Sequence, residues 1–174
     1  METKRFKNAY NALLKAYFEG TLGKWSCAAC ACGNIIAEAN NCRLTTKEFN
    51  QIIIKNNYDY ANKKEEKIEN LWFSQFGLTG SEKERDKKDL WLIKVNEAGY
   101  TGYEFWEIEK AFEDHTKIRV EKYKDSTEQE ILEDQFNGLS AVVDVLLELD
   151  NIPNENKAYN NKFREHPKLE LINN

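Results

Sequence analysis

The sequence has little proline and no segment suited to a membrane. Only two of its 174 residues are Pro, whereas β-sandwiches and barrels need chain-breaking turns between many short strands. No run of about 18 apolar residues occurs, so no transmembrane helix is expected. The opening METKRFKNAY also lacks the apolar stretch of a signal peptide. We therefore expect a helical protein that works in the cytoplasm, with its four cysteines reduced.

Motifs for nucleotides and for nucleophilic catalysis are absent as well. The chain has neither a G-x-x-x-x-G-K phosphate loop nor a G-x-G-x-x-G turn. Its two histidines, His115 and His166, have no candidate nucleophile beside them in the sequence. We expect structural roles for both histidines, and the sequence offers no catalytic residue and no cofactor-binding residue.

Charge is distributed unevenly along the chain. The formal net charge is −5, but residues 101–150 alone carry 5 basic and 14 acidic side chains, a balance of −9. Such a segment repels phosphate backbones, which disfavours direct binding to nucleic acid. It is suited to a partner protein that presents a basic surface.

The stretch 133–150, EDQFNGLSAVVDVLLELD, predicts the central helix of the fold. At about 100° per residue its apolar residues cover an arc of roughly 200°, which is too wide for a helix resting on a surface. Gly138 costs about 1 kcal/mol against Ala in a helix interior, so we expect a kink or a close neighbour there. The apolar residues are Phe136, Leu139, Val142, Val143, Leu146, Leu147 and Leu149.

Helical periodicity predicts a single all-α domain over residues 1–153, a bundle of about six helices. Thr127 begins the long helix, and residues 154–174 after Pro153 are polar with scattered aromatics, which predicts a flexible or partner-ordered tail. Short extended pieces, or a β-hairpin, are the alternative near 90–96 and 118–123. The other expected helices span 4–19, 27–39, 45–55, 65–76, 81–98 and 101–114.

Four cysteines form the pattern C-x-x-C-x-C followed by one more: Cys27, Cys30, Cys32 and Cys42. Four thiolates can build a tetrahedral zinc site. If 27–39 is helical, however, Cys32 points about 140° away from Cys27, so one helix cannot direct all three at one metal. We therefore interpret them as small buried residues, with zinc as the alternative.

Carboxylates and aromatic residues supply the candidate binding residues. Glu128, Glu130, Glu133 and Asp134 share one helix, where they form either an ordinary solvated face or an acidic docking surface. With a divalent metal, such carboxylates would also suit an enzyme. Tyr103 and Trp106 lie off the apolar stripe of their helix and are either interface anchors or packed under a loop.

Three segments, CACGNIIAEA (30–39), TGYEFWEIEKAFE (101–113) and EDQFNGLSAVVDVLLEL (133–149), resemble parts of small uncharacterised proteins from phages and mobile elements of Bacteroidetes. The resemblance implies an accessory protein that acts inside an infected bacterium, where such genes often encode inhibitors of host defence, including anti-CRISPR proteins. The hypothesis is a non-enzymatic inhibitor whose acidic surface binds a basic channel of an RNA-guided nuclease. A small zinc protein and a metal-dependent enzyme are the alternatives.

Overall fold

The computed structural model describes residues 1–23, 30–39, 97–166 and 168. In these ranges the chain forms five α-helices, three short 3-10 helices and no strand, which confirms the predicted all-α class. The helices predicted at 45–55 and 65–76, nearly all of the one predicted at 81–98, and the alternative strand at 90–96 lie outside the described residues.

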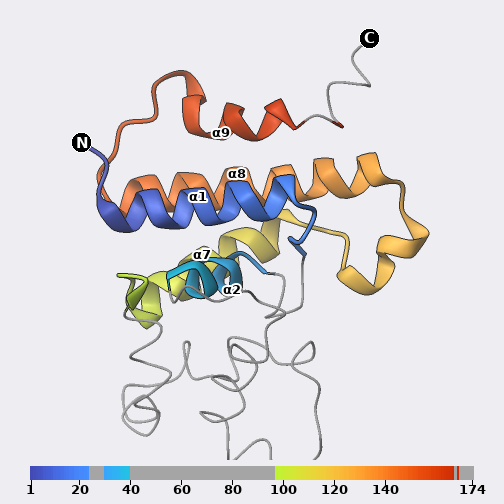
Figure 1. The fold of residues 1–174 in the computed structure, drawn as a ribbon, viewed down its shortest axis with the longest axis horizontal. Coiled ribbons are helices and arrows are strands. Elements are labelled where there is room, and N and C mark those ends of the chain that lie inside the picture. Colours follow the sequence, from blue (N-terminus) through green and yellow to red (C-terminus); the bar gives the residue numbers. More distant parts are fainter. Residues whose placement is uncertain (24–29, 40–96, 167, 169–174) are drawn as a thin grey trace, which may run out of the picture.

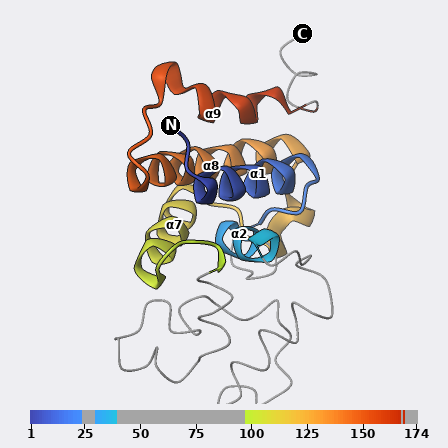
Figure 2. The same ribbon diagram turned by 60° about the vertical axis from the view of Figure 1, so that its left-hand side comes forward.

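Figure 1 shows the helices in three layers. Helices α1 and α8 run side by side in the middle layer, α2 and α7 lie on one side of them, and the C-terminal segment that contains α9 lies on the other (Figures 1 and 2). The α-helices are α1 (Lys4–Phe18), α2 (Ala31–Ala39), α7 (Gly102–His115), α8 (Glu128–Leu149) and α9 (Ala158–Lys162). The 3-10 helices are η3 (Val120–Asp125), η4 (Glu155–Lys157) and η5 (Phe163–Glu165).

Local capping fixes where the long helices begin. Thr127 and Glu130 form a reciprocal capping box at the start of α8, as do Thr101 and Glu104 at the start of α7. Each box satisfies backbone N–H groups that a helix start leaves without partners. The predicted start of the long helix at Thr127 is thus confirmed. Gly20, which follows the C-cap residue Glu19 of α1, has the left-handed conformation that is common just past a helix end, with φ of 69°.

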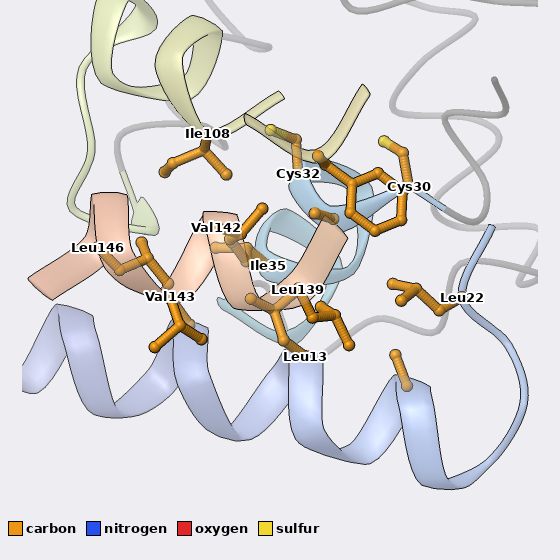
Figure 3. Packing of buried hydrophobic residues seen from close by; sticks show 14 of the residues in the cluster. Leu13, Leu22, Cys30, Cys32, Ile35, Ile108, Leu139, Val142, Val143 and Leu146 are labelled. Atoms are coloured by element: carbon orange, nitrogen blue, oxygen red, sulfur yellow. The ribbon is translucent and has the colours of Figure 1, made fainter. Parts of the chain in front are cut away.

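Helix α8 is buried by its neighbours on several sides. Leu139, Val142, Val143 and Leu146 have no exposed surface, and they meet side chains from three other helices (Figure 3). Those side chains are Leu13 of α1, Ile35 of α2 and Ile108 of α7. The predicted core arc is confirmed at its centre, and its edges at Phe136 and Leu149 are partly buried.

Gly138 of α8 packs tightly against α7. A Cβ atom built there would lie 2.8 Å from Cδ2 of Phe112 and would also overlap the methyl group of Thr116. The close neighbour predicted for this glycine is therefore Phe112 of α7, together with the residue that follows that helix.

The extended piece predicted at 118–123 is instead mostly helical. Thr116 and Arg119 have extended backbone, but η3 begins at Val120. The buried carboxylate of Asp134 accepts hydrogen bonds from the main-chain N–H groups of Lys117 (2.7 Å) and Ile118 (2.9 Å). These two donors therefore need no partner strand, and the chain is free to turn into η3.

Residues 155–165 are helical and pack on the bundle, which differs from the flexible or partner-ordered tail that the sequence predicts. Phe163 is completely buried, and its ring lies 5.6 Å from that of Tyr10 and 5.8 Å from that of Tyr17. Asn160 is also buried, and its amide donates to the carbonyl and the hydroxyl of Ser140 on α8. The segment finds its partners inside the same chain.

Arg5, in the first turn of α1, connects this helix to the end of α8 and to the start of α7. Its guanidinium donates to Asp150 at the end of α8 (2.6 Å), to Glu104 in the first turn of α7 (3.0 Å) and to the Gly99 carbonyl (2.9 Å). It also lies 4.7 Å from the ring centre of Tyr100. The Asp150 side chain is only 1% exposed, and within the described ranges its carboxylate is held by Arg5 and by the hydroxyl of Thr3.

We predict that Gly138→Ala destabilises the protein by roughly 2 kcal/mol, because overpacking at Phe112 outweighs the gain of about 1 kcal/mol in helix propensity. Urea unfolding followed by circular dichroism measures the change. Asn137→Ala, at the exposed neighbouring position, is the control and should be neutral or slightly stabilising. A Gly138→Ala protein as stable as the wild type would contradict the close packing.

We predict that Arg5→Ala lowers the free energy of unfolding by about 2–3 kcal/mol because it leaves the Asp150 carboxylate buried without its cation. The loss stays below that for a fully buried pair because the Arg5 side chain is 27% exposed. Lys4→Ala, one residue earlier and exposed, should change the free energy little in the same unfolding experiment. Equal losses in the two variants would show that the Arg5 contacts contribute nothing specific.

Candidate functional site

The candidate binding surface is the exposed side of the first turns of α8. Glu128, Glu130 and Glu133 are all exposed there. Each also has a contact within the chain: Glu128 pairs with Lys168, Glu130 completes the capping box, and Glu133 accepts from the amide of Gln129 at 2.9 Å. The backbone N–H and the hydroxyl of Thr127 lower the pKa of Glu130, so this carboxylate stays ionised at neutral pH.

Asp134 does not belong to this surface. The sequence places it with the three glutamates, but its side chain is turned inward and the residue is 8% exposed. Its two oxygens hold the N–H groups of Lys117 and Ile118, the residues that lead into η3. Asp134 therefore fixes the connection between α7 and α8 and is not available to a partner.

Other carboxylates of the acidic segment are also paired inside the protein. Asp150 and Glu104 bind Arg5, and Asp144 lies 2.9 Å from the ammonium of Lys157. Arg5 and Lys157 both lie outside residues 101–150, so the surface near α8 is less negative than the balance of −9 for that segment indicates.

Tyr103 and Trp106 lie together on α7. Tyr103 is 59% exposed, Trp106 is half-buried, and their ring centres are 5.5 Å apart. The ammonium of Lys110 lies 5.1 Å from the centre of the Trp106 ring, within the range of a cation–π contact. Tyr103 is thus an accessible aromatic side chain, as the sequence predicts for an anchor, while Trp106 already packs against Lys110.

Cys30 and Cys32 are buried, as expected of small core residues. Cys30 immediately precedes α2, and its sulfur accepts from the Gly33 N–H at 3.3 Å, in the manner of an N-cap. The thiol of Cys32 contacts the Phe105 carbonyl at 3.3 Å, and burial raises the pKa of the Cys30 thiol. Cys27 and Cys42 lie outside the described residues, and within the described ranges no three His, Cys, Asp or Glu side chains are grouped to hold a metal.

The two histidines occupy different environments. His115 is exposed at the end of α7, where its Nδ1 lies 2.9 Å from the Ala111 carbonyl. His166 is buried against Tyr17 and Phe18 of α1. The sequence contains a signal for this packing, because Tyr159, Phe163 and His166 follow the helical spacing i, i+4 and i+7.

Comparisons of this chain with protein-family models, with curated proteins and with solved structures found no match. Among the helices in the described ranges, none has both the length and the apolar composition needed to span a bilayer.

We predict that Asp134→Asn destabilises the protein by about 2 kcal/mol, because an amide has one acceptor oxygen for two backbone donors and lacks the charge that strengthens both bonds. The adjacent Glu133→Gln removes the same charge at an exposed position and should leave the unfolding midpoint nearly unchanged. Thermal unfolding of the two variants compares them directly, and equal midpoints would contradict a structural role for Asp134.

Proposed function

We propose that this protein acts by binding another protein and catalyses no reaction. The surface that would make the contact consists of the exposed glutamates Glu128, Glu130 and Glu133 on α8. The partner we propose is a host defence nuclease of the RNA-guided type, bound at the basic channel that otherwise holds nucleic acid. In this proposal the chain is a phage- or mobile-element-derived inhibitor, in keeping with the resemblance of its three segments to such proteins.

The observation that carries this proposal is the exposure of three carboxylates within six residues of one helix. A rigid helix presents them at fixed spacing, as phosphates are presented along a strand of nucleic acid. Charges of this kind at the rim of an interface mainly speed and orient association with an oppositely charged partner. The three carboxylates also lie near the N-terminus of α8, where the helix dipole is positive, so their negative charges do not destabilise the helix.

The test measures association of the purified chain with a panel of purified RNA-guided nucleases, and inhibition of their target cleavage. Glu128→Lys combined with Glu133→Lys reverses two charges while leaving Glu130 in its capping box. We expect this double variant to associate at least about tenfold more slowly at low salt, because electrostatic steering governs the on-rate. The difference should shrink as salt rises from about 50 to about 200 mM.

Glu148→Lys combined with Glu155→Lys is the matched control, since both residues are exposed and the change in net charge is the same. The control should bind at nearly the wild-type rate. Equal slowing of both double variants would show that net charge matters and the surface on α8 does not. If the wild-type chain neither binds nor inhibits any nuclease of the panel, the proposal is wrong.

A further inference from the structure

The short C-terminal segment, residues 154–166, is ordered by its contacts with the bundle. Its helices η4, α9 and η5 span three, five and three residues. Helices this short are not stable in water by themselves. Hence the segment stays docked only as long as its side chains hold α1 and α8.

The contacts of the segment are polar at one end and aromatic at the other. At the polar end, Asn160 donates to Ser140 and to Asp144 (3.1 Å), and Lys157 pairs with Asp144. At the aromatic end, Phe163 and His166 pack on α1. Lys157 has the left-handed conformation with φ of 55°, which is unfavourable for a residue with a Cβ atom, so the docked state also holds some strain.

His166 is the one group in the aromatic end that can gain a charge near neutral pH. Its ring is stacked on Phe18 at 5.2 Å and meets Tyr17 edge-on at 5.0 Å, and the residue is 4% exposed. Its Nδ1 accepts from the main-chain N–H of Lys168 at 3.3 Å, which requires that nitrogen to carry no proton. The docked geometry therefore fits a neutral imidazole.

The charged groups that act on His166 are Lys168, two residues further along the chain, and Glu128 of α8. Burial is the main cause that lowers the pKa of His166, and the Lys168 ammonium lowers it further. The carbonyls of Tyr17 and Phe18 and the carboxylate of Glu128 raise this pKa. From α1 the facing titratable group is the Tyr17 hydroxyl, which burial keeps neutral and which donates to the Leu132 carbonyl. Arg164 and Glu133 act on that hydroxyl with opposite signs, since Arg164 lowers the pKa of Tyr17 and Glu133 raises it.

We propose that residues 154–166 form a pH-sensitive clasp, which protonation of His166 releases from α1 and α8. Once released, the segment uncovers the rings of Tyr10 and Tyr17 and the Asp144 side chain. The undocked imidazole has an ordinary pKa of about 6.5, so the undocked state binds more protons once the pH falls below that value. The neutral imidazole therefore contributes fully to docking above about pH 6.5, and this contribution falls, by up to tenfold per pH unit, as the pH drops toward the lower pKa of the docked state.

Hydrogen exchange of the full-length chain tests this inference, with rates corrected for the intrinsic effect of pH. Between about pH 7.5 and about pH 5.5, protection of the amides in 158–163 should fall, by at most about tenfold, while protection in 139–147 of α8 stays constant. His166→Phe keeps an aromatic ring but cannot be protonated, so its segment should stay docked at both pH values. His115→Gln removes the exposed histidine and should respond to pH like the wild type.

An equal loss of protection in His166→Phe and in the wild type would overturn the inference, as would constant protection in the wild type. If Phe at this position prevents folding, an NMR titration of the wild-type imidazoles decides the matter. The clasp requires that protection in 158–163 is lost at the pH where the His166 ring is protonated, and a midpoint that follows the His115 ring instead would refute it. None of these outcomes depends on the identity of a binding partner.

Discussion

Burial of α8 on several sides is the constraint on which the rest of the structure depends. Between Asp134 and Asp144 the helix has no charged residue, and Leu139, Val142 and Val143 have no contact with water. Each neighbouring helix must therefore present an apolar face to α8, because every Å² of apolar surface that α8 left in water would cost about 25 cal/mol. Close contact at Gly138 sets the distance to α7, and the three-layer arrangement of Figures 1 and 2 follows from these requirements.

The carboxylates of residues 101–150 divide into structural and exposed groups. Asp150 lies at the carboxyl end of α8, where the helix dipole disfavours a negative charge, and Arg5 offsets that cost. Asp134 organises the connection into η3, and Glu104 caps α7. A count of charges treats all fourteen acidic residues alike, but the fold leaves only part of them for a partner.

Features with a local signal could be predicted from the sequence, and features formed by distant residues could not. The start of α8 at Thr127 and the apolar arc of this helix have local signals, and the low helix propensity of Gly138 indicates a kink or a close neighbour there. In contrast, Arg5 and Asp150 lie 145 positions apart, and nothing in their flanking residues indicates the pair. The inward turn of Asp134 likewise depends on backbone donors 16 and 17 residues away, so the sequence could not separate Asp134 from the exposed Glu128, Glu130 and Glu133.

An ion pair of Glu128 links the acidic surface to the C-terminal segment. Glu128 belongs to the proposed binding surface and also pairs with Lys168, just beyond the segment. The pair is exposed, so it contributes little to stability, but it places a positive charge beside the glutamates while the segment is docked. Release of the segment would remove that cation and make the surface more negative. A basic partner that prefers the more negative surface must, by linkage, favour the released state, so the two proposals predict coupled behaviour through Glu128.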